Sequence, residues 1–190
     1  MVEKEPTVTI NLADPTAVGL LAFGMTTILL ALHNLQLYPI DSVILSMGIF
    51  YGGIAQVIAG MFEFKKGNTF GATAFTSYGF FWLTFVVITT GVLPGVSAAE
   101  PAALGAYFAL WGILTLFMFF GTLKSSRAMQ IIFLSLTVLF FLVAIMKNTD
   151  VEAVAYIAGA VGILSGGTAM YTAFSVVLQE QFGREILPRC

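Results

Sequence analysis

Charged side chains are scarce in this sequence, and so are cysteine and histidine. Only 9% of the 190 residues are charged, whereas a soluble domain uses about 25% to cover its surface, so a soluble enzyme is excluded. The formal net charge of -2 provides no basic footprint for nucleic acid. The one cysteine, Cys190, excludes an intrachain disulfide. The one histidine, His33, leaves no residue set for a metal cluster or a catalytic triad, so we expect no cofactor or metal.

Long apolar runs fill most of the chain. A bilayer core of about 30 Å requires roughly 20 apolar residues per helix, and six segments meet this requirement. They are Ala17–Leu37, Ser42–Phe62, Phe70–Gly91, Ala102–Leu123, Ala128–Met146 and Val154–Leu178. The runs are continuous rather than alternating at period two, which excludes a β-barrel. We therefore expect an all-α integral membrane protein with one domain, residues 1–190, and six transmembrane helices joined by short loops.

Basic residues fall mainly on one side of the predicted membrane. That side holds both termini and the second and fourth loops, and its basic residues are Lys4, Lys65, Lys66, Lys124, Arg127, Arg184 and Arg189. The opposite side holds only Lys147. The positive-inside rule then predicts cytoplasmic N- and C-termini. We expect a plasma-membrane location, because no secretory or organelle-targeting segment precedes the first span.

A short pattern, A-[DE]-P-x-A-[VL]-G, occurs twice in the chain. It begins at Ala13 and at Ala99, 86 positions apart, and each copy opens a half of three spans. Because three is odd, the halves, about 13–91 and 99–178, must lie upside down relative to each other. Such inverted repeats are typical of channels and secondary transporters, with the solute path between the repeats. The alternative is that an acidic residue followed by proline is only a good helix start.

Small residues recur at helical spacing in two of the spans. Gly48 and Gly52 follow this spacing in the second span, and Gly162 and Gly166 follow it in the sixth. Glycine at such positions lets helix backbones approach closely. Close packing is therefore the favoured interpretation, and a path widened by missing side chains is the alternative.

The predicted spans hold neutral polar groups in place of charges. They contain no lysine or arginine, and the acidic Asp41 and Glu63 lie at span edges. Ionisable residues inside a membrane usually mark coupling sites, so their absence argues against a pump with a carboxylate relay. We expect neutral groups to line the path of a small, weakly held solute, and the candidates are Thr26, Thr27, Asn34, Gln56, Thr76 and Trp82. Hydrogen bonding between helices is the alternative role for each of them.

The single histidine lies near the outer end of the first span, beside Asn34. A partly positive imidazole is stabilised by the C-terminal end of a helix. We favour this structural role for His33 over the alternative, a proton sensor at the outer mouth.

Several segments together resemble one known family. They are FGMTT at 23–27, MGIFYGG at 47–53, GNTFG at 67–71, FTSYG at 75–79, LWG at 110–112, FFGTLK at 119–124 and QFGR at 181–184. Because of the order and spacing of these segments, the chain resembles the acetate uptake transporter family, also called the YaaH or SatP family. The resemblance extends from about Ala13 to Pro188. The resemblance implies six-helix subunits with an hourglass-shaped pore, assembled as hexamers, that carry acetate and related short carboxylates, including succinate for some members. It leaves open whether passage is proton-coupled symport or channel-like.

The resemblance also implies roles for individual residues. The family's narrowest point is an aromatic and aliphatic triplet that falls here on Phe23, Tyr78 and Leu136. Ala169 matches a position near the path that affects which solutes pass. The family's signature N-P-A-P-L-G-L reads D-P-T-A-V-G-L from position 14. The carboxylate of Asp14, in place of an amide, disfavours an anion at the inner mouth unless it is engaged as a helix cap.

A carboxylate has two ways past an apolar constriction that lacks a nearby cation. It crosses as the neutral acid, whose pKa is roughly 4–5, or as an anion that passes short apolar gaps between polar groups. We expect weak binding at several sites in either case, with a carboxylate, protons, lipid and further copies of the chain as partners.

Two other classes of protein stay open. A neutral-solute pore for urea, glycerol, water or ammonia fits the charge-free spans equally well, although no Asn-Pro-Ala sequence occurs. A membrane protein for interaction or sensing is the third hypothesis, but no loop is large enough to present a binding surface.

Overall fold

Helices make up all the regular structure in the residues that the computed structural model describes, 12–149 and 151–188. They are α1 (Thr16–Asn34), α2 (Ser42–Ile49), η1 (Phe50–Ala55), α3 (Gln56–Lys66), α4 (Thr69–Thr90), α5 (Pro101–Gly121), α6 (Arg127–Met146) and α7 (Glu152–Phe182). With α2, η1 and α3 taken as one continuous span, six spans are long and apolar enough to cross a membrane. The expected all-α fold with six such helices is confirmed, and the predicted bounds differ by at most four residues.

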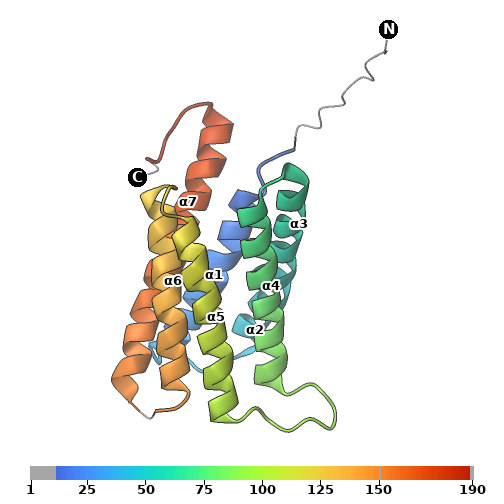
Figure 1. Cartoon of the computed structure of the whole chain (residues 1–190), viewed down its shortest axis with the longest axis vertical. Coiled ribbons are helices and arrows are strands. Elements are labelled where there is room, and N and C mark those ends of the chain that lie inside the picture. Colours follow the sequence, from blue (N-terminus) through green and yellow to red (C-terminus); the bar gives the residue numbers. More distant parts are fainter. Residues whose placement is uncertain (1–11, 150, 189–190) are drawn as a thin grey trace.

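The six spans alternate in direction along the bundle (Figure 1). The described chain begins and ends at the same end of the bundle, which we call the proximal end. The loops that follow α1, α4 and α6 lie at the opposite, distal end. Each half contains three spans, so the first span of the second half, α5, runs opposite to α1, while the inverted repeat itself stays a prediction.

Polar caps and glycines mark where the helices begin and end. Asp41 accepts hydrogen bonds from the first N–H groups of α2, and Asn68 and Ser126 do the same for α4 and α6. Gly67 ends α3 with a φ of 77°, a left-handed conformation that costs other residues more. These short-range signals explain why the sequence located the span ends well.

The second span contains a π-helical turn that the sequence did not predict. Residues Phe50–Ala55 form η1 between two α-helical segments. Single π-turns inside α-helices are frequent at functional sites. On η1, a Cβ at Gly52 would lie 2.9 Å from both the Thr26 and the Trp82 side chains. The turn therefore lets the second span pack against α1 and α4 together.

Helices α1 and α7 pack through glycine. A Cβ at Gly24 would lie 2.6 Å from the carbonyl oxygen of Gly166, and one at Gly166 would lie 2.7 Å from that of Gly24. A Cβ at Gly162 would lie 2.8 Å from Ala31. Side chains at these positions would force the two backbones apart. The packing interpretation of the glycine spacing is thus supported here.

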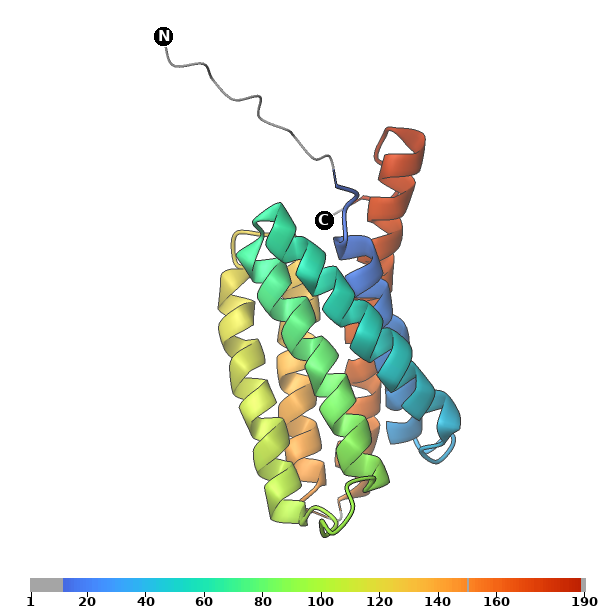
Figure 2. The same ribbon diagram turned by 90° about the vertical axis from the view of Figure 1, so that its right-hand side faces the viewer.

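Helices α4 and α5 meet through aromatic rings instead. Phe81 stacks on Tyr107 with ring centroids 5.9 Å apart, and Tyr78 lies 6.3 Å from Trp111. The Tyr107 hydroxyl also donates a hydrogen bond to the Phe81 carbonyl oxygen at 3.2 Å. In Figure 2 the α2–η1–α3 span lies beside α4 at the proximal end and diverges from it toward the distal end.

Helix α7 is longer than the sequence predicts. Its 31 residues span about 46 Å at 1.5 Å per residue, so its last turns project beyond the bundle at the proximal end (Figure 1). The chain then turns back along it, because the Tyr171 hydroxyl donates to the Pro188 carbonyl oxygen at 2.9 Å and Ser175 donates to that of Leu187 at 3.1 Å.

Candidate solute path

Two cavities enter the bundle, one from each end. The distal cavity offers about 50 Å³ of water-sized space, and its wall includes His33, Asn34 and Lys147 at the distal helix ends. The proximal cavity offers about 60 Å³ and its wall includes Thr16 and Asn68 at the proximal helix starts. One water requires about 10–15 Å³ of such space. Each cavity therefore has room for a few waters or a very small solute.

Three residues line both cavities, and they are Phe23 from α1, Tyr78 from α4 and Leu136 from α6. Their side chains are 5%, 3% and 3% exposed, so they are buried between the two cavities. They are also the triplet that the family resemblance assigns to the narrowest point. The three side chains therefore lie where the two cavities meet, and their role as the narrowest point of a solute path stays a prediction.

The surface of the triplet is apolar despite the tyrosine. The Tyr78 hydroxyl donates a hydrogen bond to Thr115 Oγ1 at 3.0 Å, on α5. Thr115 in turn donates to the Trp111 carbonyl oxygen at 2.7 Å. The hydroxyl is therefore committed to α5, and Tyr78 contributes mainly the face of its ring to the junction.

Aromatic neighbours hold the Tyr78 ring in place. The ring lies 6.2 Å from both Phe23 and Phe133, and it stacks on Phe140 at 6.4 Å with an interplanar angle of 19°. Such pairs add about 0.5–1.5 kcal/mol each beyond the burial of their surface. The junction between the cavities is thus packed largely from aromatic rings, with Leu136 beside them.

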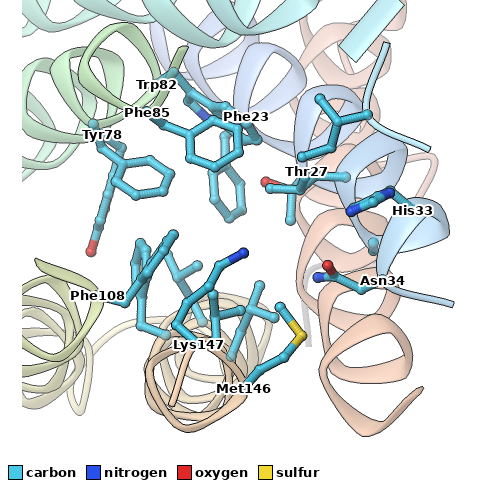
Figure 3. Close-up of a pocket in the computed structure, with 18 residues that line it drawn as sticks. Phe23, Thr27, His33, Asn34, Tyr78, Trp82, Phe85, Phe108, Met146 and Lys147 are labelled. Atoms are coloured by element: carbon cyan, nitrogen blue, oxygen red, sulfur yellow. The ribbon is translucent and has the colours of Figure 1, made fainter. Parts of the chain in front are cut away.

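The distal cavity has polar groups on one side of an aromatic wall. Figure 3 shows Thr27, His33 and Asn34 on one side of the cavity and the rings of Phe85 and Phe108 opposite. Trp82, another predicted path residue, also lines this cavity. Of the predicted path residues, three therefore lie together in the distal cavity.

Lys147 is a wall residue that sequence reasoning missed. It was placed in a loop and given no role, and the path was expected to have no cation near it. The side chain instead turns back from the end of α6, and its ammonium group points into the distal cavity (Figure 3). Burial lowers the pKa of this lysine. A loop position adjoining a span was the available signal, because a lysine stem is long enough to reach inward.

His33 has the structural role that the sequence favoured. Its Nδ1 lies 2.9 Å from the Tyr38 carbonyl oxygen, and because a carbonyl only accepts, Nδ1 must carry the hydrogen. The Tyr38 hydroxyl then donates to the Leu29 carbonyl oxygen at 2.9 Å. The two bonds fix the loop after α1 against the end of that helix.

The proximal cavity is lined by neutral groups, with a buried carboxylate beside them. Gln56, Thr16 and Asn68 line the cavity. Glu63 is 0% exposed and accepts hydrogen bonds from Thr16 Oγ1 at 2.8 Å and from Asn68 Nδ2 at 2.7 Å. The expectation that Glu63 lies only at a span edge is therefore corrected. The sequence missed its burial because Thr16 is 47 positions away.

Asp14 is bonded through one carboxylate oxygen at the proximal end. Its Oδ1 accepts hydrogen bonds from the Thr16 backbone N–H at 3.0 Å and from Lys66 Nζ at 2.9 Å. Partial burial acts to raise the pKa of Asp14, but the hydrogen bonds from Lys66 and Thr16 outweigh it and hold the pKa below its ordinary value. Its charge is thus neutralised locally, which removes the predicted repulsion of anions.

Four buried side-chain polar atoms in the described chain have no hydrogen-bond partner. They are Thr26 Oγ1, Thr27 Oγ1, Gln56 Oε1 and Thr76 Oγ1, all from the predicted path residues. Thr27 lines the distal cavity and Gln56 lines the proximal one. Unsatisfied buried polar atoms require an explanation, such as water or a ligand.

Three predicted path residues lie outside both cavity walls. Thr26 faces Gly52, Thr76 faces Gly60, and Ala169 is fully buried within the helix bundle. Their influence on the solute stays a prediction.

Six apolar spans that enclose a cavity from each end, with a buried apolar junction between them, define the class of membrane channels and transporters. Comparison with known proteins identifies the family within that class. The chain belongs to the GPR1/FUN34/yaaH family, whose sequence model matches residues 1–187.

The relatives include bacterial, archaeal and yeast proteins. The chain is 56% identical to the succinate-acetate/proton symporter SatP of Escherichia coli K12 over 179 residues, covering 94% of this chain and 95% of that protein. It is 46% identical to a protein of Methanothermobacter thermautotrophicus, and the match covers 99% of this chain and 96% of that protein. The ammonia transport outward protein 2 of Saccharomyces cerevisiae is 34% identical to this chain, and the match covers 89% of this chain and 63% of that protein.

A solved structure supports the fold. The structure of the bacterial acetate channel SatP matches with a TM-score of 0.91 and 55% identity, covering 95% of this chain and all of the other.

Proposed function

We propose that this protein transports acetate and related short-chain carboxylates, including succinate, across the membrane. The names of two similar proteins, a succinate-acetate/proton symporter and an acetate channel, support this substrate class. The observation that carries the proposal is that the two cavities share only Phe23, Tyr78 and Leu136 among the described residues. A small solute with an apolar methyl group and a polar head fits a path whose mostly apolar walls carry a few polar side chains on each side of an apolar junction.

Protonation governs passage at the junction. Burying a carboxylate anion among Phe23, Tyr78 and Leu136 without a compensating partner costs many kcal/mol, and the group neutralises instead. A carboxylic acid with a pKa of roughly 4–5 is about one part in a hundred to one in a thousand neutral at pH 7. Uptake by passage of the neutral acid therefore rises as the external pH falls.

Unpaired polar atoms give the solute places to stop on each side of the junction. Gln56 has a buried carbonyl oxygen without a partner at the proximal cavity, and the Thr27 hydroxyl has none at the distal cavity. A carboxylic acid O–H donates to either oxygen, and the threonine O–H donates to a carboxylate. Each contact is weak, so release stays fast.

We also propose the larger arrangement that the sequence predicts. Residues 1–190 form one membrane domain of two inverted repeats with an hourglass-shaped path, and the subunits assemble as hexamers. The proximal end faces the cytoplasm in the plasma membrane, because Lys147 is the only basic residue at the distal end among the described residues, and the side richer in basic residues is cytoplasmic.

A neutral-solute channel is the second candidate. One observation favours it, because a yeast relative at 34% identity is an ammonia transport outward protein. An uncharged junction of the kind formed here also admits neutral ammonia without a desolvation penalty for charge.

Uptake into proteoliposomes tests both candidates. Purified protein is reconstituted, and the entry of labelled acetate, succinate, urea, glycerol and methylammonium is measured at pH 5.5 and 7.5, with and without an imposed membrane potential. We expect entry of acetate that increases at the lower pH. Protein-free liposomes provide the background for permeation through lipid.

The outcomes separate the mechanisms. Acetate uptake that increases at low pH and does not depend on the membrane potential indicates symport or neutral-acid passage. An acetate-dependent current indicates a channel for the anion. Entry of urea, glycerol or methylammonium with no protein-dependent entry of acetate would overturn the carboxylate proposal in favour of the neutral-solute channel.

A further inference from the structure

We infer that the distal cavity is a capture site for carboxylate anions built around Lys147, with Thr27 and Asn34 as neutral hydrogen-bond donors. This inference rests on the proposed transport of carboxylates, and it adds a solute-binding residue and a difference between the two ends of the path. It assigns the capture of anions to one cavity only.

The Lys147 ammonium is free to meet a ligand. The residue directly follows the last residue of α6, and the side chain is half-buried. Figure 3 shows the ammonium pointing into the middle of the cavity, between Phe108 on one side and Thr27 and Asn34 on the other. No hydrogen bond or ion pair links it to any other residue in the described part of the chain.

Two neutral donors lie in the same cavity. The Thr27 hydroxyl is buried, lines the cavity and has no hydrogen-bond partner among the described residues. The Asn34 amide also lines the cavity, and no bond from its side chain to another described residue is present. An anion between these groups would accept hydrogen bonds from a hydroxyl, an amide and an ammonium, which are the donors that a carboxylate pairs with.

Electrostatics makes this site selective for charge. The rings of Phe85 and Phe108 form a low-dielectric wall beside the ammonium, and a cleft with such walls strengthens the field of a single charge. The field raises the local concentration of anions and leaves a neutral molecule unaffected. A dianion such as succinate gains more than acetate, and both gains fall as salt is added.

The proximal cavity has no equivalent cation in the described chain. Lys66, the basic residue bonded at that end, is held by Asp14 at 2.9 Å and lies outside the cavity wall. The two cavities therefore present different fields to a carboxylate. Entry from the distal side is expected to have the lower KM.

Substitution of Lys147 tests the inference in the full-length reconstituted protein. Lys147→Gln removes the charge, Lys147→Arg keeps it, and Lys124→Gln removes an exposed lysine at the proximal end as a matched control. Initial rates of acetate and succinate uptake are measured at 20 mM and 300 mM salt, with neutral acetamide as the uncharged counterpart of acetate. Thermal stability of each variant in detergent confirms folding.

We expect Lys147→Gln to raise the KM for acetate about tenfold at low salt, and to raise that for succinate further. The maximal rate, the entry of acetamide and the stability stay close to those of the unchanged protein. Lys147→Arg and Lys124→Gln retain the original KM. An unchanged KM and salt dependence in Lys147→Gln, while the unchanged protein transports acetate, overturns the inference and leaves the proposed function intact.

A binding measurement separates this inference from transport itself. Trp82 lines the distal cavity, so saturable quenching of tryptophan fluorescence by dichloroacetate reports an anion bound there in detergent. Lys147→Gln should weaken this binding about tenfold, and dichloroacetamide should show no saturable phase in either protein. Equal dichloroacetate affinity in both proteins overturns the inference even where no transport is found.

Discussion

The distal and proximal cavities differ in how they use charge. In the distal cavity, the ammonium of Lys147 points into the open space without a described partner. At the proximal end, Lys66 is bonded to Asp14, and both oxygens of Glu63 are bonded to neutral donors. The bonded charges of Lys66, Asp14 and Glu63 therefore stabilise the fold at the proximal end, whereas the ammonium of Lys147 lies open in the distal cavity.

This difference separates two requirements of a carboxylate path. An anion must be attracted from water, which a free cation achieves, and it must also be released, which neutral groups permit. The apolar triplet between the cavities keeps the two environments apart.

Opening the junction should have the largest effect, because it would merge the two cavities. Replacing Phe23, Tyr78 or Leu136 by alanine removes a buried side chain, which lowers the free energy of unfolding by about 2–5 kcal/mol for leucine and about 3–5 kcal/mol for phenylalanine. We also expect faster uptake of larger carboxylates such as lactate and succinate relative to acetate. Uptake of mixed labelled acids by proteoliposomes measures this ratio. Unchanged selectivity and rate in all three variants would show that the junction lies elsewhere.

Removing the Glu63 carboxylate should have the next largest effect. It should lower the free energy of unfolding through bonds lost at the proximal end. Glu63→Ala leaves the Thr16 hydroxyl and the Asn68 amide without their acceptor, and each lost bond costs about 1–3 kcal/mol. Glu63→Gln keeps one acceptor oxygen, so its free energy of unfolding should fall by less. Thermal unfolding in detergent measures both losses. Glu63→Ala with an unfolding midpoint equal to that of the unchanged protein would contradict the structural role.

Two substitutions, one in each cavity, compare the neutral polar groups of the distal and proximal cavities. Thr27→Val in the distal cavity removes an unpartnered hydroxyl while keeping the shape of the side chain, so stability should stay equal or rise by about 1 kcal/mol. Acetate uptake should nevertheless fall several-fold, and Gln56→Leu should lower it by a similar factor from the proximal side. Unfolding midpoints and initial uptake rates are compared for the two variants. Normal uptake in both would exclude these groups as contacts of the solute.

The Asp14–Lys66 pair should have the smallest effect. Its side chains are 30% and 40% exposed, and such partly exposed ion pairs contribute about 0.2–1 kcal/mol. Because the folded pKa of Asp14 is lowered from 3.8, this stabilisation is present above that value and is lost as the pH falls through the folded pKa. Asp14→Asn should remove this acid-dependent part of the stability. Unfolding midpoints at pH 7 and pH 3 test it, and an identical acid dependence in the variant would assign it to another group.

Much of the fold was predictable because its signals are local. A span is a continuous apolar run, and its ends are set by residues such as Asp41, Asn68 and Gly67 within one turn of the helix. The π-turn in the second span was not predictable. It depends on how Gly52 fits between Thr26 and Trp82, which come from two other helices.

The residues of the candidate site also divide into those that the sequence indicated and those that only the structure revealed, such as Lys147. Thr27 and Gln56 could be selected as candidates because an uncharged polar side chain inside an apolar run is visible in the sequence, and each lines a cavity, while their contact with a solute stays a prediction. The triplet was identified by resemblance, and it lines both cavities as expected for a junction.

By itself, the sequence determined that this chain spans a membrane six times and carries almost no charge within its spans, because hydropathy and the cost of buried charge depend on composition along the chain. Only the tertiary structure decided what the remaining charges do. Lys66 and Asp14 are 52 positions apart, and Glu63 and Thr16 are 47 apart. Whether a charge is paired, buried or open to a solute depends on which distant helix lies beside it, and that is a property of the packed bundle.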